Sequence, residues 1–147
     1  MADDALALDN QLCFAVYAAS HAFARAYRPL LEALGLTYPQ YLVMLVLWER
    51  DGLTVRAVGD RLGLDSGTLT PLLKRLAAAG LVTRTRDESD ERQVLVGLTP
   101  AGRVLRTRAA VVPRRMGTLI GLEAEERDHL RAAVDRLTRS LEKGAAE

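Results

Sequence analysis

Cysteine, histidine and aromatic residues are all scarce in this chain of 147 residues. A single cysteine excludes an intramolecular disulfide and any metal site built from several cysteines. The two histidines are too isolated in the sequence to indicate a metal site or a catalytic base. No nucleophile, base and orienting group can be assembled, and no glycine-rich phosphate loop is present. We therefore expect no catalytic residue, no bound metal and no cofactor.

Long apolar runs are missing too, since none reaches the roughly 18 residues that a membrane span requires. The N-terminus carries acidic residues where a signal peptide would carry cations. We expect a cytoplasmic protein with no membrane partner. The length predicts a single domain over residues 1–147, and the formal net charge of +1 gives no indication of nucleic-acid binding.

One amphipathic stretch, from Asp65 to Gly80, organises the middle of the chain. Asp65 is a good helix N-cap, and Gly80 suits the left-handed position just beyond a helix end. Four leucines between them recur at i, i+3, i+4 and i+7, which predicts one buried stripe. The opposite face carries hydroxyls and cations, which suit DNA base edges and phosphates but equally suit a solvated helix face. Its members are Ser66, Thr68, Thr70, Lys74 and Arg75.

The neighbouring segments favour the DNA interpretation of this face. Upstream, Thr54 caps a short predicted helix that Gly63 closes, so two helices meet across a tight turn as in a helix-turn-helix unit. Downstream, residues 81–86 and 94–98 alternate apolar and polar and predict a β-hairpin with a polar tip. Helix, helix and hairpin in this order, over residues 53–98, predict a winged helix-turn-helix within a mainly α-helical fold.

Further helices are predicted before this unit. The first covers residues 6–28, Pro29 restarts a short helical turn, and Gly35 ends it. A capping-box sequence then opens an almost wholly apolar helix over residues 38–49, which we expect to be the central core helix. The side of the first helix that we expect to be buried carries Leu8, Leu12, Ala15, Val16, Ala19 and Phe23.

Two more helices are predicted after the hairpin. One extends from Thr99 to about Met116, and Pro113 should kink or break it because proline removes a backbone donor. Gly117 and Gly121 are expected in a loop, and a last helix covers residues 123–142. The flanking helices, in residues 6–34 and 99–142, are too long for one small core. A second copy of the chain would cover them, and a two-fold homodimer would present two reading helices to a palindromic DNA site.

Cys13 lies early in the first predicted helix. On spacing alone it is most simply an inert cysteine that serves as a small apolar residue. Tyr17 lies one turn further on the same face, whereas Tyr27 is in phase but about 21 Å away along the helix. Tyr27 could therefore reach only a partner's Cys13, where two first helices cross antiparallel. Tyrosine hydroxyls near a sulfur favour the thiolate, which is the form that peroxide attacks.

The order of helices around the winged helix resembles the MarR family of bacterial dimeric regulators. Asp90-Glu91-Arg92 at the hairpin tip resembles the acidic-x-Arg wing motif of that family. The segments LDNQLCFAVYAAS, YRPLLEALGLTYPQYLVMLVLWE and LDSGTLTPLLKRL resemble its OhrR branch, the repressors that sense organic hydroperoxides. The resemblance covers the chain from about Leu8 to Gly102 and is looser over the last helix.

This resemblance implies a peroxide-sensing role for Cys13, with Tyr27 and Tyr38 as its hydrogen-bond donors and Tyr17 nearby. It implies double-stranded DNA, a palindromic operator, as the partner of the homodimer. Because the chain has no second cysteine, a small thiol or further oxidation is expected to consume the sulfenic acid. The expected DNA-contact residues are Ser66, Thr68, Thr70, Lys74, Arg75, Arg84, Arg86, Asp90 and Arg92.

Three functions are compatible with these features. The first is a repressor that organic hydroperoxide releases from DNA. The second is a repressor of the same fold that a small aromatic ligand releases, with Cys13 inert. The third is a thiol peroxidase, which the DNA-reading unit and the lack of a base or arginine beside the cysteine argue against.

Overall fold

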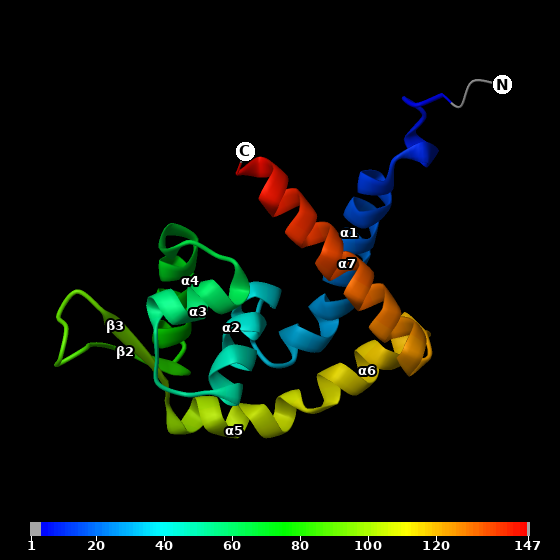
Figure 1. The fold of residues 1–147 in the computed structure, drawn as a ribbon. Helices are drawn as coiled ribbons and strands as arrows, with labels where there is room; N and C mark the ends of the chain where they lie inside the picture. Colours follow the sequence, from blue (N-terminus) through cyan, green and yellow to red (C-terminus); the bar gives the residue numbers. More distant parts are fainter. Residues whose placement is uncertain (1–3, 147) are drawn as a thin grey trace. The chain divides into compact units, whose positions relative to one another are not determined.

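The computed structural model describes residues 4–146, which form two compact units that divide between Val112 and Pro113. The first unit contains a small three-stranded antiparallel sheet among helices, and the second contains α7 and most of α6 (Figure 1). The predicted mainly α-helical winged-helix fold is confirmed. The elements are η1 (Leu8–Asn10), α1 (Leu12–Glu32), α2 (Tyr38–Glu49), β1 (Leu53–Thr54), α3 (Val55–Leu62), α4 (Ser66–Ala78), β2 (Val82–Arg86), β3 (Val94–Leu98), α5 (Pro100–Ala109), α6 (Val111–Ile120) and α7 (Ala124–Ala145).

Helix α1 differs from its prediction at both ends. The backbone of Gln11 is extended, so α1 begins after a separate 3-10 turn, and it continues through Pro29 without a break. The proline cannot donate to the carbonyl one turn earlier, yet the last turn is held by Leu31, which is only 1% exposed. Arg108 in α5 also donates to the carbonyl of Ala33, just beyond the helix, at 2.8 Å. The expected restart at Pro29 is therefore wrong, because tertiary packing outweighs one lost hydrogen bond.

The side of α1 that was expected to be buried is exposed in the single chain. Leu12, Val16 and Phe23 of α1 are 64%, 39% and 44% exposed, Leu8 in η1 is 57% exposed, and Leu31 is the only buried residue of α1. The apolar periodicity was correctly identified, but most of this stripe is not buried in the described chain. A contiguous exposed apolar stripe is typical of a protein–protein interface.

Helix α2 is the predicted core helix, and its capping box is present. The hydroxyl of Thr37 accepts from the backbone N–H of Gln40 at 3.4 Å, and the Gln40 side chain accepts from the backbone N–H of Thr37 at 3.0 Å. The helix is covered on most sides, although Leu45 is 39% exposed. Its buried residues are Tyr41, Val43, Met44, Val46 and Leu47.

Helices α3 and α4 form the predicted helix-turn-helix unit. The turn requires Gly63, whose φ of +67° lies in the left-handed region that glycine adopts without strain. It also requires Gly59, because a Cβ there would lie 2.6 Å from the carbonyl oxygen of Leu64. The leucine stripe of α4 is buried as predicted and consists of Leu69, Leu72, Leu73 and Leu76.

Strands β2 and β3 form the predicted antiparallel hairpin, with Val82 paired to Leu98 and Arg86 to Val94. We call residues 82–98 the wing. Its tip projects away from α3 and α4 in Figure 1. A third strand, β1, pairs with the other edge of β3. It was not predicted because two residues are too short to show an alternating pattern.

The predicted break near Pro113 is present, but it precedes the proline. Helix α5 ends at Ala109 and α6 begins at Val111, which places Pro113 within the first turn of α6. The carbonyl of Ala109 would need an N–H at position 113, and proline has none, so the helical ladder ends there. Gly117 lies inside α6, which corrects its expected place in a loop, whereas Gly121, with φ +68°, does close the helix.

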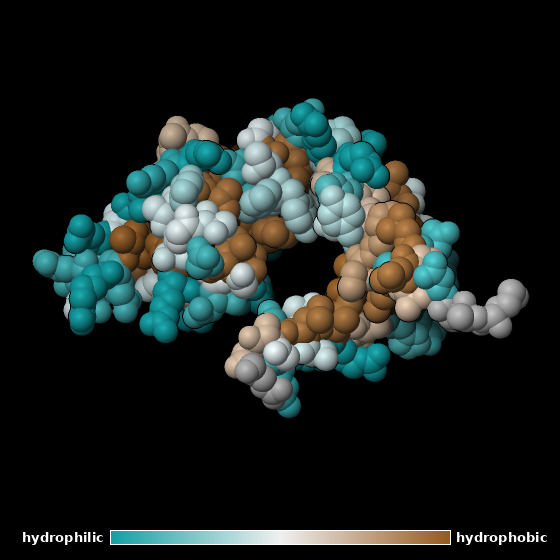
Figure 2. Space-filling view, turned by 90° about the horizontal axis from the view of Figure 1, so that it is seen from above, coloured by the Kyte–Doolittle hydropathy of each residue, from teal (hydrophilic) through white to brown (hydrophobic). Residues whose placement is uncertain are grey.

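Helix α7 begins with an unpredicted capping box and is longer than expected. The Glu126 side chain accepts from the backbone N–H of Glu123 at 2.9 Å, and the helix extends to Ala145. It contains no buried residue, and Figure 2 shows hydrophobic side chains along its surface. No helix within residues 4–146 is long and apolar enough to cross a membrane.

Candidate nucleic-acid interface and cysteine site

The start of α4 is fixed by its N-cap. The Asp65 carboxylate accepts a hydrogen bond from the backbone N–H of Thr68 at 2.7 Å, and this bond holds the pKa of Asp65 below its usual value. The buried leucine stripe fixes the rotation of the helix about its own axis. Together they turn the hydroxyl and cation face of α4 toward solvent.

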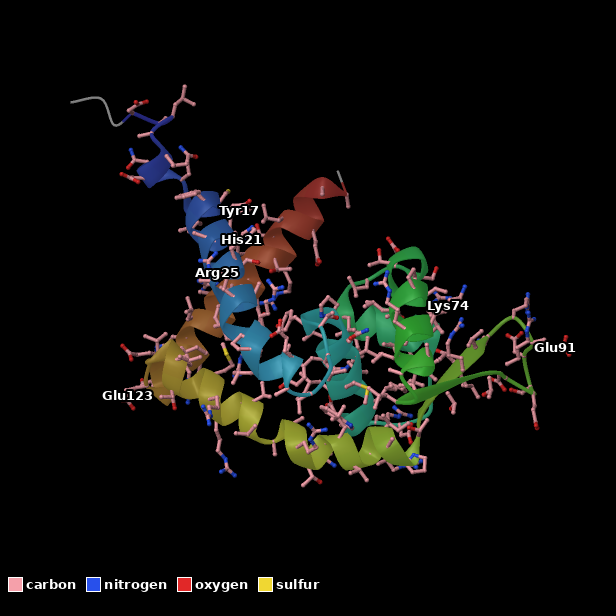
Figure 3. The ribbon with its side chains drawn as sticks, turned by 180° about the vertical axis from the view of Figure 1, so that it is seen from behind. Tyr17, His21, Arg25, Lys74, Glu91 and Glu123 are labelled. Atoms are coloured by element: carbon pink, nitrogen blue, oxygen red, sulfur yellow. The ribbon has the colours of Figure 1, made fainter. Side chains whose placement is uncertain are left out.

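Most of the DNA-contact residues predicted on α4 are exposed. Ser66, Thr68, Lys74 and Arg75 are exposed, and Thr70 is half-buried. Figure 3 shows Lys74 projecting from the helix into solvent. Pro71 also lies in this helix, and it withholds the N–H that the carbonyl one turn earlier would accept. Pro71 was not singled out from the sequence, although its position inside the predicted helix is evident there.

The wing tip consists of polar residues that hold one another in place, and it is hydrophilic in Figure 2. The Asp90 carboxylate accepts from both the backbone N–H and Nε of Arg92, at 3.1 and 3.3 Å. The Arg92 side chain remains 92% exposed. Arg86 donates to the carbonyl of Glu91 at 3.3 Å, and Figure 3 shows Glu91 at the tip. Within the described chain, Asp90 and Arg86 therefore brace the tip, and Arg92 is the side chain that it presents.

A groove of about 670 Å³ lies between the starts of α3 and α4 on one side and the wing on the other. It brings together some of the predicted DNA-contact residues and leaves others outside. Thr68, Lys74, Arg75 and Arg86 do not line it. The predicted residues that do line it are Ser66, Thr70, Arg84, Asp90 and Arg92.

Two of the predicted sensor tyrosines meet at the junction of α1 and α2. The ring centroids of Tyr27 and Tyr38 are 4.7 Å apart, and Tyr41 completes the cluster at 5.9 and 6.4 Å from them. Burial, followed by the neighbouring phenols of Tyr38 and Tyr41, raises the pKa of Tyr27 to about 12. The Tyr27 hydroxyl therefore keeps its proton at physiological pH and can serve as a hydrogen-bond donor. From the sequence, Tyr41 was predicted only as part of the core helix.

The tyrosine cluster borders a cavity of about 400 Å³. Its apolar lining includes Leu31 and Leu36, and Tyr27 and Tyr38 contribute the aromatic part. Arg28 and Glu32 also line it and form an exposed ion pair at 3.1 Å. This cavity combines an apolar lining with hydroxyl donors.

Cys13 lies in the first turn of α1, at the opposite end from this cluster, and is exposed. Tyr17 is also exposed and packs against His21 with a ring separation of 4.3 Å, as Figure 3 shows along one side of the helix. One chain thus brings Tyr27 and Tyr38 together and leaves Cys13 and Tyr17 apart from them. Fourteen residues of helix separate Cys13 from Tyr27, about 21 Å at 1.5 Å per residue.

The chain has clear relatives among known regulators. Residues 25–107 match the family of the transcriptional regulator SarA/Rot. The HTH-type transcriptional regulator TtmR of Methylorubrum extorquens is 58% identical over 92% of this chain and 68% of its own length. The organic hydroperoxide resistance transcriptional regulator of Bacillus subtilis is 48% identical over 95% of this chain and 92% of its own.

A solved structure of a DNA-bound protein has the same fold. The structure of reduced AbfR bound to DNA, a protein of Staphylococcus epidermidis, superposes with a TM-score of 0.81. The two sequences are 37% identical, and the match covers 97% of this chain and 98% of the other. Winged-helix architecture, wing motif and relatives agree: the chain belongs to the MarR family of winged-helix transcriptional regulators and is of the OhrR type.

Proposed function

We propose that this protein is a DNA-binding transcriptional repressor that senses organic hydroperoxides by oxidation of Cys13 and then releases its operator. One observation carries the proposal: the lone thiol lies at one end of α1, and Tyr27 near the other end of that helix packs against Tyr38 of α2. The 48% identity to an organic hydroperoxide resistance regulator supports it. The protein acts in the cytoplasm and does not turn peroxide over as an enzyme.

In the proposed complex, α4 enters the major groove of double-stranded DNA. Its short hydroxyls meet base edges, while Lys74 and Arg75 neutralise phosphates. The wing tip reaches the adjacent minor groove, where the exposed guanidinium of Arg92 finds a strongly negative potential. Asp90 orients that guanidinium through the hydrogen bonds described above.

The DNA-binding form is a homodimer, assembled through residues 6–34 and 99–142. Two helices support this assembly, because each exposes an apolar stripe that water disfavours. In α1 the stripe includes Leu12 and Phe23, and in α7 it includes Leu130, Val134 and Leu141, which are 54%, 42% and 63% exposed. A two-fold dimer presents two α4 helices to half-sites about one helical turn apart on a palindromic operator.

The sensing site contains residues of both chains. Cys13 of one protomer receives hydrogen bonds from Tyr27 and Tyr38 of the other, and these donors favour its thiolate. The thiolate attacks the terminal oxygen of the hydroperoxide, so the O–O bond breaks, the cysteine becomes a sulfenic acid and an alcohol leaves. A small thiol then displaces the hydroxyl as water and forms a mixed disulfide. The added group overpacks the interface and moves the reading helices off their half-site spacing.

The decisive experiment is a binding titration on the promoter DNA nearest the gene, with and without an organic hydroperoxide. The wild-type protein should bind, and peroxide should release it, more completely when a small thiol is added. Cys13→Ser should bind with wild-type affinity and stay bound in peroxide. Release of Cys13→Ser by peroxide would show that another residue, such as Met44, is the sensor. Rapid catalytic consumption of peroxide with a thiol reductant would instead favour a peroxidase.

A further inference from the structure

The groove between the helix-turn-helix unit and the wing carries three arginines from three separate elements. Arg56 comes from the first turn of α3, Arg84 from the middle of β2 and Arg92 from the wing tip. Arg56 is not among the DNA-contact residues predicted from the sequence. Its position in the groove becomes evident only when α3 and the wing are placed side by side.

Arg84 lies on the inward face of its strand. Side chains alternate along a strand, so Arg84 shares a face with Val82, which is 3% exposed and part of the core. The Nε atom of Arg84 is buried and has no hydrogen-bond partner among the described residues. Buried donors are normally paired, so this unpaired Nε is unusual. Arg84 also lines the groove, so the rest of its guanidinium can donate to a group that enters there.

Carboxylates also line the groove, but two of them are already engaged. Asp65 caps α4, and Asp90 accepts from the wing arginine. Asp60 lies one turn beyond Arg56 on α3. No ion pair among residues 4–146 includes Arg56 or Arg84, so both cations keep their charge available for an anion.

The DNA grooves that α4 and the wing tip occupy determine which part of the DNA passes through the protein groove between them. In the proposed complex α4 occupies the major groove and the wing tip occupies the adjacent minor groove. One sugar–phosphate strand separates any two adjacent grooves of a duplex, so this strand must cross between α4 and the wing. The N-termini of α3 and α4 both open there, and helix N-termini favour phosphate.

We infer that Arg56 and Arg84 bind the phosphates of this strand and thereby fix the depth at which α4 sits in the major groove. The inference rests on the proposed function. It assigns Arg84, with Arg56, to backbone contact and leaves base choice to the exposed face of α4. Contacts to phosphates carry no sequence information themselves, but they do determine the salt dependence of binding.

The test is the slope of log affinity against log salt for Arg56→Gln and the matched control Arg61→Gln. Both arginines lie on α3, both changes remove one charge, and Arg61 faces Glu49 at 2.6 Å instead of lining the groove. A dimer loses two phosphate contacts, so Arg56→Gln should reduce the slope by about 1.8, at roughly 0.9 per contact. Arg61→Gln should leave it near the wild-type value, and Arg56→Lys should largely restore it.

A second measurement locates the contact on the DNA. Neutral methylphosphonates are placed in the strand between the major-groove half-site and the adjacent minor groove. They should weaken the wild type but have little further effect on Arg56→Gln, because the charge pair is already broken. Lys74→Ala, which removes a cation outside the groove, should remain sensitive to them. Arg84→Gln should behave like Arg56→Gln, with thermal unfolding measured to verify that the half-buried variant is folded.

The outcomes separate the inference from the function on which it rests. Equal slopes for Arg56→Gln and Arg61→Gln, with wild-type protein that binds its promoter, would overturn the inference alone. The inference would also be overturned if Arg56→Gln reduced the salt slope on the specific site but not on random DNA, because a phosphate contact contributes to binding of both kinds of DNA. A wild-type protein that binds no DNA would overturn the function and the inference together.

Discussion

The indole Nε1 of Trp48 donates a hydrogen bond at 2.9 Å to the carbonyl of Gly102, a residue 54 positions later in the chain. The bond joins the end of the core helix α2 to the first turn of α5. A Cβ on Gly102 would clash with the carbonyl oxygen of Leu81, which also accepts the backbone N–H of Thr99 at 3.1 Å. The core helix α2, the base of the wing and α5 therefore meet at Gly102, where there is no room for a side chain.

Replacing Gly102 with alanine should destabilise the protein by about 1 to 3 kcal/mol, because the new methyl group forces backbone apart at this junction. Urea unfolding monitored by circular dichroism measures the change. Gly144→Ala is the control, since a Cβ there meets nothing within 4 Å. It should change stability little or raise it slightly. Equal stability of the two variants would mean that the α5 junction relaxes without cost.

Alkaline pH should destabilise the fold through Tyr27. Its pKa is raised to about 12 in the folded protein, chiefly by burial, against a usual value of 10.0. The unfolded chain therefore loses this proton first, and the stability that Tyr27 contributes is complete below pH 10 and lost as pH rises toward 12. Because the side chain is partly exposed, solvent screening limits the loss to about 1 to 2 kcal/mol.

Urea unfolding at a series of pH values tests this expectation, with Tyr27→Phe as the reference. The variant should show a shallower decline between neutral and strongly alkaline pH than the wild type. Identical declines would show that Tyr27 titrates alike in the folded and unfolded states.

Tyr27→Phe and Tyr38→Phe should bind DNA normally but respond to peroxide more slowly. Each change removes one donor from the partner's Cys13 and leaves less thiolate at neutral pH. Stopped-flow oxidation followed by loss of DNA anisotropy measures the rate. Raising the pH should narrow the gap to the wild type, because the thiol then ionises without help. A rate deficit that is independent of pH would indicate a packing effect instead of a thiolate effect.

Leu137 lies on the same face of α7 as Leu130, Val134 and Leu141. Leu137→Asp should weaken the dimer and its DNA affinity together, because it forces a charge into the apolar contact proposed for α7. Sedimentation velocity and a DNA titration on the same samples measure both effects. Ala132→Asp adds the same charge to the opposite side of α7, where position 132 is exposed, and should leave both properties unchanged. A monomeric wild-type protein that still binds a palindrome tightly would contradict the proposed assembly.

The sequence was most informative where local chemistry determines structure, although the capping box of α7 was missed. Asp65, the leucine stripe and Gly63 specify α4 and its turn through capping, periodicity and backbone freedom, which are all properties of short segments. The exposed hydroxyl and cation face of α4 could be predicted for the same reason, since it is the side opposite the buried leucines. The capping box at Thr37 is likewise local.

Features that depend on distant partners were not readable. Tyr41 joins the predicted sensor tyrosines because α1 packs on α2, and Pro29 is tolerated because Leu31 is buried beyond it. The pairing of Asp90 with Arg92 depends on the geometry of the wing tip, which an acidic-x-Arg motif does not specify. Arg56 gave no signal because its groove is formed by elements separated by tens of residues in the sequence.

Between Leu12 and Leu30, α1 contains no buried residue, and this has a consequence for how much protein a cell must make. In the proposed dimer the thiol acquires its donors only when two chains meet. Dilution below the dissociation constant of the dimer would therefore abolish repression and peroxide response at the same concentration. Expression level therefore sets whether the response exists at all: a cell that makes too little of this protein transcribes the target gene constantly and cannot raise its transcription when peroxide appears.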